Sequence, residues 1–359
     1  MTTRQNRIYQ LLNLPFSSLV IKYDHYFSGE LISNVLIEHE ETDEVTDVFT
    51  FEGYYVALLT KTVVISNYRT NKTFSLEEDK RFLRFCVPLS SGKFLFLSSG
   101  KFLFLTYEPP SIYIIDFNTE NIQLQELDID SDISYVKMME NKIVLSTYDE
   151  IFIIDSETLL VENMVQTGTI NNGLVIYKNQ IISIDIGDGS MIVNFWNSSN
   201  LEFINSININ DTLEDQSVSV IKCIKNKLIL GYSSGRIVIM DLEGKNSIID
   251  IERDEQLSVR DILIRKNNFV VRFEDCIQIF DLEGDLIDEI LLENQLYIFS
   301  LPNDQMLIMN EENIKLYDFD TYELQHITNL FLVDNYKAAI SSTGKLIVLL
   351  HNGELLIYK

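Results

Sequence analysis

One short motif recurs along the whole chain: four mostly apolar residues, with β-branched side chains favoured, followed by aspartate. Four copies fit it closely, and they are Ile112–Asp116, Ile151–Asp155, Ile237–Asp241 and Ile277–Asp281. A looser form, in which other residues replace aspartate or the apolar run is interrupted, adds Val63–Asn67, Val193–Asn197, Ile314–Asp318 and Leu355–Lys359. A repeat of this kind constrains the architecture far more than it constrains the activity.

The spacing of the motif indicates what each repeat builds. The motifs end at positions 67, 116, 155, 197, 241, 281, 318 and 359, so most repeats are close to the roughly 40 to 45 residues of a four-stranded propeller blade. One repeat shows the order clearly, with apolar runs at 218–224, 228–232, 237–241 and 248–251 separated by turn residues. Continuous apolar runs are typical of strands buried on both faces. Gly244 and Gly284 follow the third strand, where a tight turn needs positive φ.

These features resemble the WD-repeat β-propeller family, in which a third strand ending near Trp-Asp recurs once per blade. The aspartate position of that pattern is matched by Asp116, Asp155, Asp241, Asp281 and Asp318. The match is degenerate, because the only tryptophan is Trp196, Asn197 follows it, and the family's Gly-His pair is absent. The resemblance implies an all-β fold, with a single closed β-propeller of four-stranded blades over residues 18–359.

The two ends of the chain bear on how the ring is completed. The last motif ends at residue 359, so we expect an N-terminal strand at 31–37, or alternatively 19–23, to supply the missing fourth strand and remove an exposed edge. The count is then eight blades, with seven as the alternative. A tandem copy of Ser-Ser-Gly-Lys-Phe-Leu-Phe-Leu at 90–97 and 98–105 is consistent with an extra hairpin. Residues 1–17 are expected to contain a short amphipathic helix that ends before Pro15.

Composition limits the class of partner and the compartment. The chain has 54 acidic and 28 basic residues and a formal net charge of -26, which repels nucleic acid and anionic membrane surfaces. No apolar run has the roughly 20 residues of a membrane helix. The three cysteines, Cys86, Cys223 and Cys276, have no Cys-x-x-Cys spacing, and reduced core thiols indicate a cytoplasmic or nuclear protein.

Loop position then predicts where the charge lies. In a propeller, connections from a fourth strand to the next first strand share a face with the turns between second and third strands. About half of the 54 acids fall in these loops or in the segment after the closing strand. Lysines gather in the opposite turns, at Lys93, Lys142, Lys178, Lys225, Lys227, Lys266 and Lys345. The predicted partner-binding acidic face comprises Glu77, Glu78, Asp79, Asp128, Asp130, Asp132, Asp211, Glu214, Asp215, Asp254 and Glu255.

No pattern of catalytic or metal-binding residues emerges from the sequence. The loop Asp128–Asp132 begins like a calcium loop, but Ile133 and Met139 occupy the positions of the required glycine and glutamate. The stretch 185–189 suits a tight loop as well as a metal site. His25, His39, His326 and His351 show no ligand spacing with one another or with the cysteines. We therefore expect no catalytic residues, no metal and no cofactor.

The sequence supports three hypotheses for function. The first is a non-catalytic scaffold, part of a multiprotein complex or chaperone-like, whose acidic face binds a Lys/Arg-rich protein segment without direct contact to nucleic acid or insertion into a membrane. The second is a scaffold or ligase-adaptor subunit that recognises partners through blade sides or the N-terminal helix. The third is a propeller enzyme with a channel site. The acidic loops can equally be ordinary solvated surface.

Overall fold

A computed structural model describes 24 segments of the chain. They are residues 31–36, 45–51, 54–59, 62–67, 71–75, 83–90, 93–98, 101–103, 106–108, 111–127, 129, 131–167, 170–187, 190–209, 217–243, 248–251, 257–292, 297–301, 305–309, 313–319, 321–329, 336–340, 345–350 and 354–358. Every regular element in them is a β-strand. The helix expected in residues 1–17 lies outside these segments.

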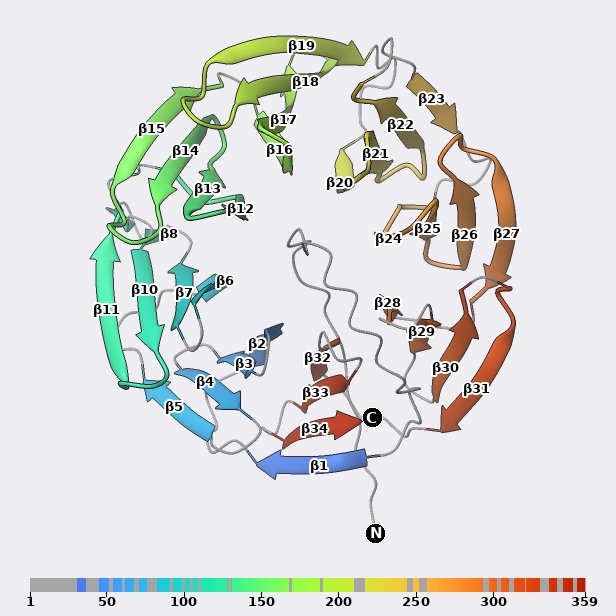
Figure 1. Ribbon diagram of the computed structural model, residues 1–359, viewed down its shortest axis with the longest axis horizontal. Coiled ribbons are helices and arrows are strands. Elements are labelled where there is room, and N and C mark those ends of the chain that lie inside the picture. Colours follow the sequence, from blue (N-terminus) through green and yellow to red (C-terminus); the bar gives the residue numbers. More distant parts are fainter. Residues whose placement is uncertain are drawn as a thin grey trace. The chain divides into compact units, whose positions relative to one another are not determined.

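The strands of the described segments form eight four-stranded sheets and one two-stranded sheet (Figure 1). Within most four-stranded sheets the strands pair in chain order, each with the next. The chain is thus an all-β propeller with four-stranded blades, which confirms the fold class that the repeat predicted. A closed ring of eight blades stays a prediction.

The chain divides into two compact units, and unit 1 comprises Met1–Ser99, Ser111–Gln125 and Asn294–Lys359. Its sheets contain β2 (Val45–Phe51), β3 (Tyr54–Leu59), β4 (Thr62–Asn67) and β5 (Asn71–Ser75); β6 (Leu83–Ser90), β7 (Lys93–Ser98), β10 (Ser111–Asp116) and β11 (Asn121–Glu126); β28 (Tyr297–Ser300), β29 (Gln305–Met309), β30 (Asn313–Asp318) and β31 (Leu324–Asn329); and β32 (Tyr336–Ile340), β33 (Leu346–Leu350), β34 (Glu354–Tyr358) and β1 (Leu31–Leu36).

Unit 2 comprises Gly100–Pro110 and Glu126–Glu293. Its sheets contain β12 (Tyr135–Met139), β13 (Lys142–Ser146), β14 (Glu150–Asp155) and β15 (Val161–Gln166); β16 (Ile170–Tyr177), β17 (Gln180–Gly187), β18 (Ser190–Asn197) and β19 (Phe203–Ile209); β20 (Val218–Ile224), β21 (Lys227–Tyr232), β22 (Ile237–Asp241) and β23 (Ile248–Ile251); β24 (Asp261–Arg265), β25 (Asn268–Arg272), β26 (Cys276–Asp281) and β27 (Leu286–Leu291); and the pair β8 (Lys101–Leu103) and β9 (Thr106–Glu108).

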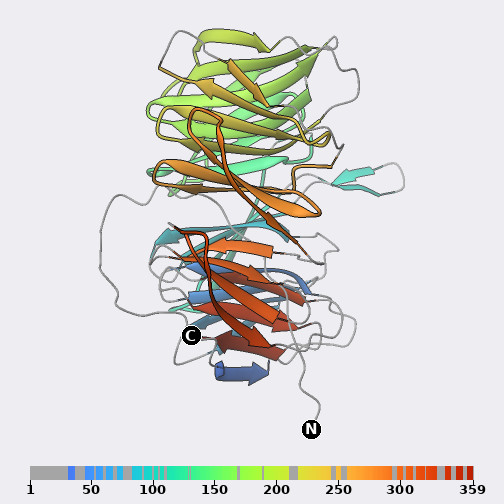
Figure 2. The ribbon, with the colours of Figure 1, turned by 90° about the vertical axis from the view of Figure 1, so that its right-hand side faces the viewer.

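Two irregular features of the sequence have direct structural counterparts. The strand expected at residues 31–37 is β1, which pairs antiparallel with β34 and places Asn34 opposite Leu356. The second copy of the tandem repeat gives β8, which forms a separate ribbon with β9 (Figure 2). Strand β7 pairs directly with β10, Phe96 opposite Tyr113, so the duplication is an inserted hairpin, as predicted.

The burial pattern explains why the middle strands of each repeat are the most apolar. All six residues of β21 and all five of β29 are buried, whereas five of the six residues of β27 are exposed. Middle strands have a neighbouring strand on both edges, whereas the fourth strand lies at the edge of its sheet. In unit 2 the core lies between successive sheets, where buried side chains of β20–β23 pack against those of β24–β27. The prediction of two-sided burial holds for second strands such as β21 and β29 and for third strands such as β14 and β22, whereas β30 buries only alternate residues.

Candidate functional site

The sheet β12–β15 shows how the predicted acidic loops come together. The backbone N–H of Ser134, just before β12, donates to the carbonyl of Ser146 at 2.8 Å. The N–H of Thr167, just after β15, donates to the carbonyl of Asp149 at 2.7 Å. The connections that enter and leave the sheet therefore lie at the same end as the turn between β13 and β14. This is the arrangement from which the acidic face was predicted.

At this end, Asp132 is exposed in the connection before β12, and Asp149 and Glu150 are partly exposed in the turn between β13 and β14. Two loops thus bring three carboxylates to one end of one sheet. Asp132 alone of the predicted acidic face falls in the part of the chain that the structure describes. The others lie outside it, and they are Glu77, Glu78, Asp79, Asp128, Asp130, Asp211, Glu214, Asp215, Asp254 and Glu255.

Two arginines also lie at this end of the sheets of unit 2. The predicted face did not include them because it was drawn from acidic residues only. Arg236, in the turn between β21 and β22, donates to both carboxylate oxygens of Asp250 at 2.8 and 2.6 Å. Arg260, just before β24, forms an ion pair with Glu274 in the turn between β25 and β26. Indexing the basic residues by the same loop classes would have placed both arginines correctly. These arginines offset part of the negative charge at this end of sheets β20–β23 and β24–β27.

Three of the lysines predicted for the opposite end pair with acids of that same end. Lys142 Nζ lies 2.8 Å from Glu162, and Lys178 pairs with Glu243. Lys227 lies 3.4 Å from Asp241 and 3.6 Å from Glu283. The predicted electrical polarity is therefore weaker in unit 2 than the lysine positions alone suggest.

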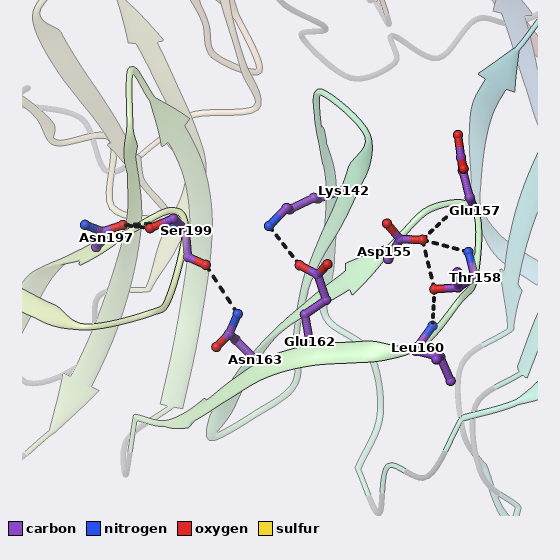
Figure 3. Close-up of polar contacts among 9 residues, drawn as sticks. All are labelled: Lys142, Asp155, Glu157, Thr158, Leu160, Glu162, Asn163, Asn197 and Ser199. Carbon is purple, nitrogen blue, oxygen red and sulfur yellow. Dashed lines mark hydrogen bonds and ion pairs between the residues drawn. The ribbon is translucent and has the colours of Figure 1, made fainter.

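The anchor residues at the ends of the third strands serve the turn that follows them. Asp155 Oδ1 accepts the backbone N–H groups of Glu157 and Thr158 at 3.0 and 2.7 Å (Figure 3). Asn197 accepts the N–H of Ser199 in the same way, at 2.8 Å. These are turns in which the side chain replaces a backbone acceptor, and Asp116, Asp241, Asp281 and Asp318 repeat them. The anchor residues therefore order the turn that follows each third strand.

A turn of this type also joins neighbouring sheets. The side-chain amide of Asn163, on β15, donates to the carbonyl of Ser199 in the turn after β18 at 3.3 Å (Figure 3). In unit 1, Lys72 on β5 donates to the carbonyl of Phe117 and pairs with Glu120, both in the turn after β10 and both at 2.8 Å. The fourth strand of one sheet thus contacts the anchor turn of the next.

The stability of the anchor turn should depend on pH. Hydrogen bonds from the backbone N–H and the hydroxyl of Thr158 lower the pKa of Asp155 below its ordinary value of 3.8. A depressed carboxyl pKa contributes stability above the unfolded-state pKa, and this is lost as pH falls through the folded-state value. Asp155→Asn should keep the acceptor, as Asn197 does, and remove the titration. We expect acidification from about pH 5 to about pH 3 to destabilise the wild type more than this variant.

Urea unfolding of both proteins at the two pH values measures this difference, with Glu157→Gln in the same turn as the control. Equal losses of unfolding free energy in the wild type and in Asp155→Asn would contradict the assignment.

Other groups considered from the sequence are structural or outside the described segments. Asp185 is not in a loop as expected but in strand β17, 1% exposed, where it accepts the Asn194 side-chain amide at 2.6 Å. Cys86 and Cys276 are buried and are not in disulfides, and burial raises the pKa of Cys223 to about 11. Within the described segments, no group of three His, Cys, Asp or Glu side chains could hold a metal ion. The same segments contain no helix with the length and hydropathy to cross a bilayer.

Comparison with known proteins supports the fold and no more. No family model matches the sequence, and no curated protein matches it significantly. Solved structures do match: the computationally designed Ika8 protein has a TM-score of 0.65 at 13% identity, covering 90% of this chain and 98% of its own. BamB from Moraxella catarrhalis has a TM-score of 0.64 at 9% identity, covering 92% and 99%. The AfRom2 CNH domain has a TM-score of 0.51 at 12% identity, covering 90% and 98%.

Proposed function

We propose that the protein is a non-catalytic scaffold that binds a Lys/Arg-rich protein segment at the acidic end of its sheets. The observation that carries this proposal is the meeting of Asp132, Asp149 and Glu150 at one end of sheet β12–β15. The sequence adds Asp128 and Asp130 directly before Asp132, and the net charge of -26 favours a cationic partner at long range. The partner would be another subunit of a cytoplasmic or nuclear complex.

The proposal includes the architecture that presents these loops. In it, the eight four-stranded sheets form one closed ring of WD-repeat-like blades, completed where β1 pairs with β34. A closed ring would bring the corresponding loops of successive blades to one face. The acidic connections at 77–79, 211–215 and 254–255 would then flank those of sheet β12–β15.

The exposure of the carboxylates to solvent determines how the binding should depend on salt. Solvent-exposed carboxylates each contribute little, so affinity requires several of them to act on one segment. Exposed charges are screened over about 8 Å at physiological ionic strength. Binding should therefore weaken strongly as salt is raised, and association should be fast.

Charge reversal tests the proposal against a matched control. The test variant is Asp132→Lys/Asp149→Lys/Glu150→Lys, and the control is Glu140→Lys/Glu157→Lys/Glu202→Lys. The control changes net charge equally at exposed turn positions of the opposite end, and Lys178 and Lys225 show that lysine adopts the positive φ of Glu140. Fluorescence anisotropy of a labelled oligolysine peptide at about 0.05 M and about 0.3 M salt gives the affinities.

We expect the test variant to bind the peptide at least about tenfold more weakly at low salt, and the control to lose less than about threefold. Equal losses in the two variants would mean that the peptide responds to net charge alone, and would overturn the site. Salt-independent binding would overturn the mechanism.

A second function, recognition through blade sides, is favoured by apolar residues exposed on and beside the fourth strands. Leu160 and Met164 at β15 are 63% and 57% exposed, Phe203 on β19 is 56% exposed, and Leu291 on β27 is 76% exposed. A partner held there would remain bound at high salt, since apolar contact is not screened. The salt series therefore separates the two functions.

A further inference from the structure

Strand β27 is the edge strand of its sheet and has one open side. It pairs with β26, and no other strand of the described segments pairs with it (Figure 1). Five of its six residues are exposed. An open strand edge presents a row of backbone N–H and C=O groups, to which an extended polypeptide can add as a further strand.

The register with β26 shows which backbone groups point to the open side. The N–H of Leu292, directly after β27, donates to the carbonyl of Asp275 at 2.8 Å, and Cys276 lies opposite Leu291. Opposing residues of an antiparallel pair alternate between hydrogen-bonded and non-hydrogen-bonded positions. Leu291 and Glu289 are therefore at non-hydrogen-bonded positions towards β26, and their own N–H and C=O groups point to the open side.

The side chains of β27 combine exposed apolar groups with unbalanced negative charge. Ile287 and Leu291 are 47% and 76% exposed, and Asp288 and Glu289 lie exposed between them. Glu289 accepts the side-chain amide of Gln278 at 2.6 Å. Among the described residues, no lysine or arginine forms an ion pair with either of these two acids. The strand thus presents two carboxylates without a positive partner, flanked by apolar side chains.

The two carboxylates determine which kind of strand can add to this edge. Two copies of β27 paired antiparallel across the middle of the strand would set the acids of one copy directly opposite those of the other. Like charges in such positions destabilise a strand pair, and the net charge of -26 on each copy adds to the repulsion. A strand with basic residues opposite Asp288 and Glu289 would place opposite charges together instead.

We propose that β27 binds an extended segment of a partner protein as an added antiparallel strand. From its N-terminal side, this segment carries an apolar residue opposite Leu291, any residue opposite Ile290, and basic residues opposite Glu289 and Asp288. The inference rests on the second function proposed above, recognition through blade sides. It adds to that function the strand, the mode of binding and the sequence pattern of the partner.

A labelled peptide tests this proposal against the full-length protein. Its central residues are valine, threonine, lysine and lysine in that order, and fluorescence anisotropy at about 0.15 M salt gives the affinity. Two further peptides each carry one backbone N-methyl group, on the first lysine or on the second. The N–H of the first lysine, opposite Glu289, would pair with β27, whereas that of the second, opposite Asp288, would point away. The two methylated peptides have the same composition and charge.

We expect the unmodified peptide to bind saturably. The methyl group on the first lysine should weaken binding at least about tenfold, and that on the second less than about threefold. The variant Asp288→Lys/Glu289→Lys should lose at least about tenfold in affinity, and Leu291→Ser at least about threefold. The control Glu157→Lys/Glu202→Lys makes the same change in net charge at exposed turns of other sheets and should bind as the wild type does.

Absence of saturable binding to the wild type, or undiminished binding to both β27 variants, would overturn β27 as the site. Equal weakening by the two methyl groups would overturn the added strand, and a loss in Leu291→Ser would then still support recognition through exposed apolar residues. The variant Asp132→Lys/Asp149→Lys/Glu150→Lys should bind this peptide as the wild type does, so the acidic end is tested separately. A native-like fluorescence spectrum of Trp196 in each variant shows that a loss of binding is not a loss of fold.

Discussion

Replacing Gly231 with alanine should destabilise the protein by about 2 to 3 kcal/mol. Gly231 lies on β21, and an added Cβ would stand 2.4 Å from Cγ1 and 2.9 Å from Cβ of Val259. Such contacts are far inside van der Waals distance, so one of the two backbones would have to move. Val259 cannot move freely, because its N–H donates to the Tyr232 carbonyl at 3.0 Å and its carbonyl accepts the Ser219 hydroxyl at 2.7 Å.

Urea unfolding followed by Trp196 fluorescence measures this effect, and two further variants make it specific. Gly173→Ala is the matched control, since its Cβ would meet Ile221 Cγ2 at 3.3 Å, and it should cost less. Adding Val259→Ala to Gly231→Ala should recover part of the loss, because it shortens the side chain that clashes. A loss below about 0.5 kcal/mol in Gly231→Ala would show that the two sheets are not held this closely.

Replacing Ser183 with alanine should cost about 1 to 3 kcal/mol, the second large effect. The indole N–H of Trp196 donates to the Ser183 hydroxyl at 3.0 Å, and Ser183 is fully buried. Trp196 is itself 7% exposed, so the N–H would lose its acceptor without gaining water. A buried donor without a partner carries its full desolvation penalty.

Ser146→Ala provides the contrast for this prediction. Ser146 is also fully buried, but its hydroxyl makes no hydrogen bond with the described residues. Its removal should leave stability unchanged or raise it slightly. Chemical denaturation followed by far-ultraviolet circular dichroism compares the two variants. Similar losses in both would mean that side-chain volume, and not the bond to Trp196, determines the cost.

The repeat was predictable because local chemistry specifies it. The expected strands at 218–224, 237–241 and 248–251 coincide with β20, β22 and β23. The expected strand at 228–232 is β21, which begins one residue earlier. Apolar runs bounded by turn residues leave little freedom in where a strand begins. The positive φ of Gly284, +89°, was predictable for the same reason.

The contacts between sheets were not predictable from local patterns. The approach of Gly231 to Val259 depends on how successive sheets stack. The pairing of Arg236 with Asp250, within sheet β20–β23, depends on strand register. Loop class placed Asp132 at the end of sheet β12–β15 that also carries the turn between β13 and β14. It did not predict the arginine–carboxylate pairs that offset negative charge at this end of the other sheets.

The pairing of β1 with β34 has a consequence for how the chain acquires its structure. Asn34 and Leu356 meet across this ladder although they lie near opposite ends of the described sequence. The other ladders of this sheet join strands that are adjacent in the chain and close over short loops. The sheet of β32, β33 and β34 therefore receives its fourth strand only through a very long loop closure, which is entropically costly and slow. During synthesis, β1 emerges long before β34 exists, and the edge of β34 is covered last.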